Sequence, residues 1–375
     1  MNPPPASVAE PGKMRLASVD ALRGFTMFWI SFGVVIFHEI LRVCEGPTAE
    51  ALLQQFYHVE WEGFTFYDLI FPMFLFLVGV VLPFSLKRRA KDGAGRCRLL
   101  RHIARRAVIL ILLGLILNGL MQFEFAEGQM RWPGVLQRIG ICYFFGSLIV
   151  LFTGWRGQAI TAASILVAYW LMVTFIPVPE FGAGVITPEG CLPAYIDRLL
   201  VPGRFCCFSF GDNEGLLSTL PAVASVLVGM LTGHGLLSKA SGSRKVVTMA
   251  LVGGACLLVG YLWGLSFPII KNIWTSSYVL VAGGWSLLLL ALFYWSIDVL
   301  GFKKWAFFFI VIGMNSILAY VVVRLVNFSY TAEKLAMGIA NLLGDYKEAF
   351  LALSTFTLIW LFLYFLYRNK FFIKV

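Results

Sequence analysis

Charged residues are scarce in this sequence. Asp, Glu, Lys and Arg make up 13% of its 375 residues, whereas apolar residues reach 59%, well above the roughly 45–50% of soluble domains. This composition excludes an ordinary water-soluble domain and indicates an integral membrane protein. The net charge of +10 would suit a nucleic-acid partner, but the basic residues must first be assigned to sides of the membrane.

Three other features are absent. The first 14 residues, MNPPPASVAEPGKM, have no apolar core, so they predict a disordered tail rather than a signal peptide. The seven cysteines include no metal-type CxxC pair, and no metal site is predicted. No segment recurs at a fixed period, which weakens an inverted-repeat transporter interpretation. Residues 15–375 are therefore predicted to form a single membrane domain.

A disulfide is left open among the cysteines of the predicted outer segments: Cys44, Cys191, Cys206 and Cys207.

Long apolar segments fill most of the chain. A helix of about 20 apolar residues can cross about 30 Å of hydrocarbon. Ten segments of this kind are predicted at roughly 20–42, 64–86, 107–123, 134–153, 158–178, 215–238, 247–267, 278–297, 306–325 and 347–367. The sequence therefore predicts an all-α polytopic membrane protein with about ten transmembrane helices.

The basic residues predict how these helices are oriented. Nine of the 30 lysines and arginines lie in the loop 87–106, which is therefore expected in the cytosol. Alternation then places both termini and the other basic segments in the cytosol, so the basic residues indicate topology and no nucleic-acid partner. The predicted outer loops are 43–63, 124–133, 179–214, 268–277 and 326–346. The longest of these, 179–214, is rich in proline and glycine and predicts a folded cap rather than a helix.

An ionisable pair stands at the entry to the second segment, in HVEWEGFTFYDLIFP. His58 is one of four histidines, and a neutral imidazole can act as a base or attack an acyl group. On composition alone, a solvated interfacial histidine is the simpler explanation. Asp68 could close a Thr-x-x-Asp capping box with Thr65, or its carboxylate could orient His58. Trp61, between them, favours the membrane interface.

Further polar residues lie near the predicted outer ends of other spans. RWPGVLQRIG contains Gln137 and Arg138, and Arg138 is expected to face a buried anion rather than to reach outward. GDNEGLL contains Asp212 and Glu214, which would suit the helix dipole at the start of the sixth span or a binding role. GMNSILAY contains Asn315 and Ser316, for which an interhelical hydrogen bond is the alternative to binding.

A second polar group is predicted at the cytosolic end of the first span, in RLASVDALRG. Ser18 is a candidate N-cap, and Asp20 and Arg23 have the i, i+3 spacing of an ion pair. An arginine beside basic loops would also suit a phosphate-bearing donor. Polar groups on both faces indicate a site open to two compartments.

Five stretches in order resemble the heparan-alpha-glucosaminide N-acetyltransferase family of transmembrane acyltransferases and its bacterial relatives. They are RLASVDALRGFTMFWI, HVEWEGFTFYDLIFPMFLFLVG, RWPGVLQRIGICYF, DNEGLLSTLPAV and GMNSILAYV, and they extend from residue 15 to residue 321. The resemblance implies transfer of an acetyl group from cytosolic acetyl-CoA to an amino sugar or other glycan acceptor on the far side. It also implies that His58 is the active-site histidine. An acetyl-histidine intermediate and a ternary complex with His58 as general base both stay open.

The chain departs from the human-type pattern in two ways. It reads ISFGVV, with Gly33 and Val34, where that pattern has an asparagine. It also begins without the extra extracytosolic domain, the span that follows this domain, or a sorting signal. The resemblance therefore favours a bacterial inner (cytoplasmic) membrane protein over a lysosomal enzyme. Two alternatives are a permease for a small anion or sugar, with Arg138 and Asn315 lining its pathway, and a non-enzymatic scaffold. A homodimer is left open.

Overall fold

The computed structural model describes residues 16–44, 46–91, 95–122 and 130–372, so the predicted N-terminal tail lies outside the described residues. The elements, in chain order, are α1 (Ala17–Phe28), α2 (Val34–Val43), α3 (Pro47–Gln54), α4 (Phe66–Lys91), α5 (Arg96–Leu117), α6 (Val135–Phe152), α7 (Trp155–Phe175), α8 (Leu192–Leu200), β1 (Cys207–Phe208), β2 (Gly211–Asp212), α9 (Thr219–Leu237), α10 (Gly242–Gly264), α11 (Ser276–Tyr294), α12 (Phe307–Met314), α13 (Ser316–Leu325), α14 (Phe328–Ala340) and α15 (Lys347–Arg368). Short π-helical segments join α1 to α2 (Trp29–Gly33) and extend α11 (Trp295–Val299).

All ten predicted segments coincide with helices, and the all-α polytopic architecture is confirmed. Within the described residues, eight helical stretches are long and apolar enough to cross a membrane, and nine if the bent pair α12 and α13 counts as one span. Helix α5 is the tenth segment. It is 22 residues long, but the arginines in its first half make it too polar to be counted with the others.

Several predicted loops contain helix. Helices α4 and α5 both extend into the predicted loop 87–106, and α14 lies within the predicted loop 326–346. The segment 179–214 does form a cap, with a two-stranded antiparallel β-ribbon. The expectation that it contains no helix was wrong, because α8 lies within it. Pro193 occupies the first turn of α8, where a proline sacrifices no hydrogen bond.

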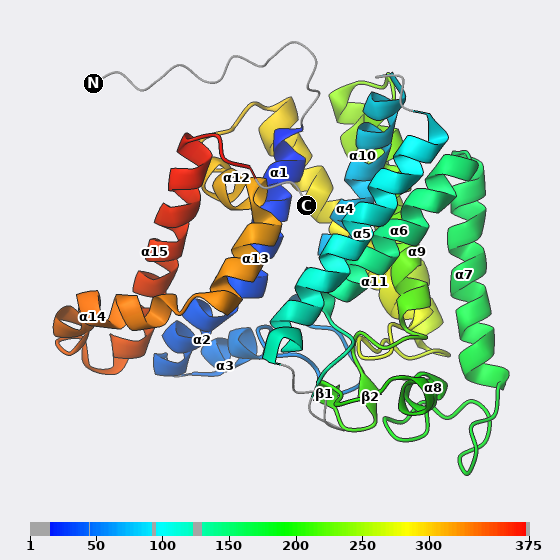
Figure 1. Ribbon diagram of the computed structural model, residues 1–375, viewed down its shortest axis with the longest axis horizontal. Coiled ribbons are helices and arrows are strands. Elements are labelled where there is room, and N and C mark those ends of the chain that lie inside the picture. The colour runs from blue at the N-terminus through cyan, green and yellow to red at the C-terminus, as the bar shows by residue number, and fades with distance from the viewer. Residues whose placement is uncertain (1–15, 45, 92–94, 123–129, 373–375) are drawn as a thin grey trace.

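The helices run side by side, and short elements gather at one end of them (Figure 1). Helices α3, α8 and α14 and the β-ribbon lie at this end, which is the predicted outer side. Helix α1 begins and α15 ends at the opposite end. The two described ends of the chain therefore lie on one side of the bundle, as the alternation requires. That this side is the cytosol remains a prediction.

The contact between α4 and α9 positions the segments that carry the polar groups. At Gly229 of α9, an added Cβ would lie 2.0 Å from the carbonyl oxygen of Phe76, and at Gly79 of α4 it would lie 2.0 Å from that of Val226. The two backbones thus touch, which only glycine allows at these positions. Asp68 at the start of α4 and the turn before α9 are consequently held side by side.

The first span differs from expectation at its start and contains a π-helical turn near its middle. Ser18 is not the N-cap, because the helix begins at Ala17 and the Ser18 N–H donates to the Asp298 carboxylate at 3.1 Å. Gly33, at the position where an asparagine was expected, closes the π-helical turn. A Cβ at Gly33 would lie 2.6 Å from the rings of Phe28 and Trp29, so a larger side chain would require these rings to move.

Candidate active site

His58 and Asp68 lie in direct contact. The Nδ1 atom of His58 is 2.7 Å from the Oδ1 atom of Asp68. The imidazole stacks on the ring of Tyr67, with 4.2 Å between ring centroids and 7° between ring planes. The His58 side chain is 43% exposed, whereas that of Asp68 is fully buried. The structure therefore presents an accessible imidazole, oriented from behind by a buried carboxylate.

Asp68 fulfils both roles that the sequence left open. Its Oδ2 atom accepts hydrogen bonds from the Thr65 N–H at 3.2 Å and from the Thr65 hydroxyl at 3.0 Å. The first bond is the acidic half of a capping box. In the other half the hydroxyl departs from the motif, because it donates to the carboxylate and to the Tyr57 carbonyl, at 2.8 Å. Oδ1 meanwhile remains available for His58.

Pro72 explains why Asp68 also contacts α11. A proline inside a helix has no N–H to donate to the carbonyl four residues before it, and here that carbonyl belongs to Asp68. The buried hydroxyl of Tyr278 donates to this carbonyl at 2.8 Å. Helix α11 thus supplies the hydrogen bond that α4 lacks, and it fixes Asp68 in place.

The third member of the site, Lys271, was not among the predicted residues. Its Nζ atom lies 2.8 Å from His58 Nδ1 and 3.4 Å from Asp68 Oδ1. The loops before α4 and α11 run together, because the Gly63 N–H donates to the Ile269 carbonyl at 2.9 Å. The side chain of Asn272 also donates to the Glu60 carbonyl, at 3.2 Å. One sequence signal was available, since Lys271 is the only charged residue between Lys245 and Asp298.

The turn that carries Lys271 is tightly held. The Thr275 hydroxyl accepts the Ile270 N–H at 3.0 Å, and the Trp274 N–H donates to the Lys271 carbonyl at 3.0 Å. Trp274 has φ = 50°, a left-handed conformation that is uncommon outside glycine. Ile270 and Ile273 are buried against the cap. The position of Lys271 is therefore set by the fold and not by a freely moving loop.

Burial of Lys271 changes its charge balance. The side chain is 8% exposed. Desolvation lowers the pKa of Lys271 below its ordinary value of 10.5, while the negative charges of Asp68 and Glu214 act in the opposite direction. The ammonium form therefore depends on these carboxylates.

Asp212 and Glu214 were predicted to suit the start of a helix, but α9 begins only at Thr219. Both carboxylates instead pair with Arg131. The Arg131 Nε atom lies 2.8 Å from Asp212 Oδ2, and Nη2 lies 2.6 Å from Asp212 Oδ1 and also contacts Glu214. The dipole interpretation was therefore wrong. Arg131 begins the stretch RWPGVLQRIG but was not among the predicted residues, unlike Gln137 and Arg138.

Arg138 is almost fully buried, at 1% exposure, so it does not reach outward. Its Nη2 atom donates to the Gly215 carbonyl at 3.1 Å and to the Ser218 hydroxyl, and the guanidinium lies 5.0 Å from the centre of the Trp274 ring. Its hydrogen-bond partners in the described chain are neutral, and its Nε and Nη1 atoms are buried without a partner there. That Arg138 faces a bound anion stays a prediction. Arg138 joins the turn before α9 to the turn that carries Lys271.

A buried carboxyl, that of Asp197 in α8, holds the same turn. It accepts the N–H groups of Asp212 at 3.1 Å and Leu216 at 2.9 Å. Burial raises the pKa of Asp197 to about 6 even though these bonds favour the ionised form. The cap and the α9 turn are therefore linked by a group that titrates in mildly acidic conditions.

Two other predicted residues support loops. The Gln137 side chain donates to the Trp132 carbonyl at 3.2 Å. Trp61 donates its indole N–H to the Ile186 carbonyl of the cap at 2.8 Å and packs against Phe208. Trp61 thus joins the loop after His58 to the cap, and Gln137 joins the start of α6 to the loop before it.

The remaining predicted residues form a separate group around the break between α12 and α13. Arg23 binds Asp20 at 2.7 Å, as the spacing predicted, and donates from Nε to the Gly313 carbonyl at 2.8 Å. Asn315 donates to the Phe371 carbonyl at 3.0 Å, and the adjacent Ser316 starts α13. None of the hydrogen bonds described for these residues reaches His58, so the structure does place polar groups at two separate positions.

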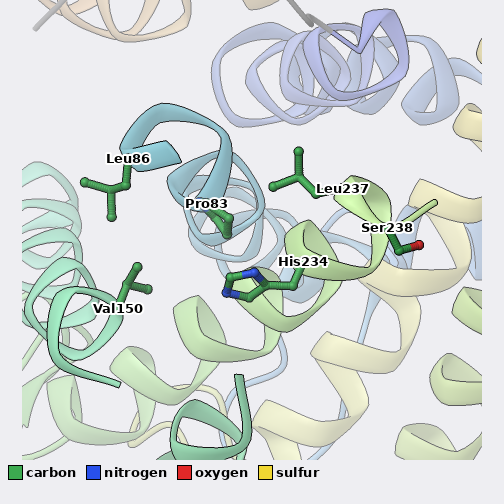
Figure 2. Close-up of a pocket in the computed structure, with 6 residues that line it drawn as sticks. All are labelled: Pro83, Leu86, Val150, His234, Leu237 and Ser238. Carbon is green, nitrogen blue, oxygen red and sulfur yellow. The ribbon is translucent and has the colours of Figure 1, made fainter. Parts of the chain in front are cut away.

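A cavity of about 420 Å³ lies near the far ends of α4 and α9. Figure 2 shows the imidazole of His234 directed toward the space between Pro83, Leu86 and Val150. His234 also contacts the Gln158 side chain at 3.1 Å. Asp68 and Pro83 are 15 residues apart on α4, which corresponds to about 22 Å along a helix. The cavity is therefore distinct from the His58 site.

In the described parts of the chain, no cluster of three or more His, Cys, Asp or Glu side chains could hold a metal ion. Cys206 is disulfide-bonded, whereas Cys44, Cys97, Cys142, Cys191 and Cys256 are free.

The fold and site define a polytopic helical membrane protein with an exposed histidine held by a buried Asp–Lys pair. Residues 15–265 match the family model described as heparan-alpha-glucosaminide N-acetyltransferase, catalytic, and the chain belongs to this family. It is 27% identical to the heparan-alpha-glucosaminide N-acetyltransferases of Homo sapiens and Mus musculus, over 82% and 85% of its length. The chain spans about half the length of these relatives, 52% and 56% respectively.

Proposed function

We propose that this protein is a transmembrane acyltransferase that moves an acetyl group from cytosolic acetyl-CoA to an amine or hydroxyl group of a sugar or glycan on the other side of the membrane. Family membership supports the reaction class. The single observation that carries the proposal is the contact of His58 with buried Asp68, 2.7 Å between Nδ1 and Oδ1. A bacterial inner membrane, with a periplasmic acceptor, is the proposed location.

The contact fixes the form of the imidazole. An ionised carboxylate only accepts hydrogen bonds, so the proton of the His58–Asp68 contact lies on Nδ1. The lone pair is then on Nε2, which becomes the reactive atom.

Two reaction sequences use this lone pair. In the first, Nε2 attacks the thioester carbonyl, the C–S bond breaks and CoA leaves as the thiolate. The acceptor then attacks the acetyl-imidazole, the C–N bond to Nε2 breaks, and the proton of the acceptor passes to Nε2. In the second, both substrates are bound together and Nε2 removes the acceptor proton directly as a general base. Asp68 stabilises the positive charge that develops on the imidazole in both sequences.

The donor and acceptor are proposed to approach from opposite ends. Arg23 and the basic loops beside α1 supply positive charge for the phosphates of acetyl-CoA. At the other end, Trp61, Asp212 and Glu214 are proposed to bind the acceptor. An indirect role is proposed for the other predicted residues, which hold these loops and helices in place: Gln137, Arg138, Asn315 and Ser316.

Binding of the donor is the first prediction. Millimolar acetyl-CoA should raise the thermal unfolding temperature of the purified protein by several degrees, because a ligand that binds only the folded state stabilises it. The shift should shrink with added salt, since phosphate contacts are screened. The matched control is pantetheine, which lacks the phosphates. Absence of any shift at millimolar acetyl-CoA would contradict the proposal and would favour the permease alternative.

A further inference from the structure

Lys271 is a buried charge at the back of the reactive histidine. Its side chain is 8% exposed, and lysine is rarely buried without a partner. Its Nζ atom is 2.8 Å from His58 Nδ1 and 3.4 Å from Asp68 Oδ1. Nζ, Nδ1 and Oδ1 therefore lie at the corners of a small triangle.

Only one arrangement of protons satisfies this triangle. A ring nitrogen of histidine offers one in-plane position for a hydrogen bond, so Nδ1 can bond either Asp68 or Lys271. If Lys271 donated to a lone pair on Nδ1, two acceptors, Nδ1 and Asp68 Oδ1, would lie 2.7 Å apart without a proton between them. Nδ1–H therefore donates to Asp68. The ammonium group of Lys271 then pairs with Asp68.

This pairing matters because an uncompensated carboxylate also affects the resting imidazole. A negative charge in contact with an imidazole favours its protonated form, and a protonated imidazole has no lone pair on Nε2. Lys271 supplies the opposite charge at the same carboxylate. The Asp68–Lys271 pair is neutral overall, yet Asp68 still holds Nδ1–H.

Charges on the other elements around the site do not replace Lys271. Tyr278 of α11 contacts the Asp68 backbone and not its carboxylate, and the Glu214 carboxylate before α9 contacts Arg131. Arg324 of α13 lies over the Tyr320 ring, 4.3 Å from its centroid, and acts electrostatically on Tyr67, the ring stacked on His58. Apart from His58 itself, Lys271 is the sole cationic side chain within 4 Å of the Asp68 carboxylate in the described residues.

We propose that Lys271 is a positioning residue that compensates the charge of Asp68 and so keeps His58 in its neutral, reactive form at neutral pH. Its value for acetyl transfer rests on the proposed function, but its effect on His58 does not. Lys271 acts through Asp68 and His58, without contact to the acetyl group.

The test uses the purified full chain and diethyl pyrocarbonate, which modifies the neutral imidazole. Mass spectrometry of the peptide that contains His58 gives the modification rate between pH 5 and pH 9. Lys271→Met should move the pH of half-maximal rate upward by about one unit or more, because removal of a neighbouring charge shifts a titration by about 1–3 units. Lys271→Arg, which keeps the charge, should leave it close to that of the unchanged protein.

Lys271→Gln is a second neutral variant in case the methionine side chain disturbs folding, and size-exclusion profiles identify the variants to be compared. A half-maximal pH that is the same in the neutral variants and in Lys271→Arg would overturn the proposal. Because this readout needs no acetyl transfer, an upward shift in a protein without transferase activity would support the inference and refute only the proposed function. If transfer does occur, the acidic limb of its pH profile should move in the same direction in Lys271→Met.

Discussion

At the scale of single residues, Asp68 connects most of the site. Its two carboxylate oxygens bind different partners, Thr65 on one side and His58 with Lys271 on the other. Its backbone carbonyl binds Tyr278. Helix start, imidazole orientation and contact with α11 therefore meet in one buried residue. Loss of its charge should therefore affect both the chemistry at His58 and the burial of Lys271.

Asp68→Asn is the prediction at this scale. The amide keeps the shape of the side chain and an oxygen acceptor, but it no longer stabilises positive charge on His58. We expect kcat/KM for acetyl transfer to fall on the order of 100-fold or more. The thermal unfolding temperature should fall as well, because buried Lys271 loses its counter-charge. Glu50→Gln, on α3 and remote from the described contacts of His58, is the charge-matched control. Full activity in Asp68→Asn would refute the assigned role.

Sequence patterns predicted part of this residue-level picture. The spacing of Thr65 and Asp68 predicted the helix start, whereas His58 was selected by the family resemblance and not by composition. Lys271 could not be selected in this way because it is 213 residues from His58 in the chain. Its position depends on the pairing of two loops, and no local pattern encodes that pairing.

At the scale of elements, the segments around the site are held by hydrogen bonds from neighbouring helices. Helix α4 contains Pro72, and α11 supplies the missing hydrogen bond through Tyr278. Arg138 of α6 holds the turn before α9. The spans themselves follow from apolar length and were predicted, whereas these contacts between elements were not. Asp212 and Glu214 were predicted to lie at the start of a helix, whereas they pair with Arg131 in the turn before α9.

A double-mutant cycle tests the dependence of α4 on α11. Tyr278→Phe leaves the buried Asp68 carbonyl without a donor and should lower the free energy of unfolding by about 1–3 kcal/mol. In a Pro72→Ala background the new N–H can bond to this carbonyl, so the same change should cost less. The measurement is reversible unfolding in mixed micelles. Equal costs in both backgrounds would show that the hydroxyl serves another purpose.

At the scale of the whole molecule, polar groups are divided between two ends of one bundle. The loops before α4 and α11 meet at His58, and the break between α12 and α13 carries the group around Arg23. Figure 1 places the start of α1 and the end of α15 at the end opposite the cap. A transfer reaction between two compartments requires that these two ends of the bundle face opposite sides of the membrane.

Native cysteines can test that match. Cys44 follows α2 at the predicted outer side, and Cys97 lies in the first turn of α5 at the predicted inner side; both are exposed and free. A membrane-impermeant maleimide should label Cys44 in intact cells or right-side-out vesicles, and Cys97 only after permeabilisation. Cys44→Ser and Cys97→Ser identify each label. The reverse pattern would invert the proposed topology.

The central claim is that the acetyl group passes at His58, and the most direct measurement is turnover by the purified His58→Ala protein. Acetyl transfer from acetyl-CoA to an amino sugar should fall on the order of 100-fold or more, while the stabilisation by acetyl-CoA is retained. His102→Ala, on α5, should keep the activity of the unchanged protein. Turnover by His58→Ala at the rate of the unchanged protein would contradict the account.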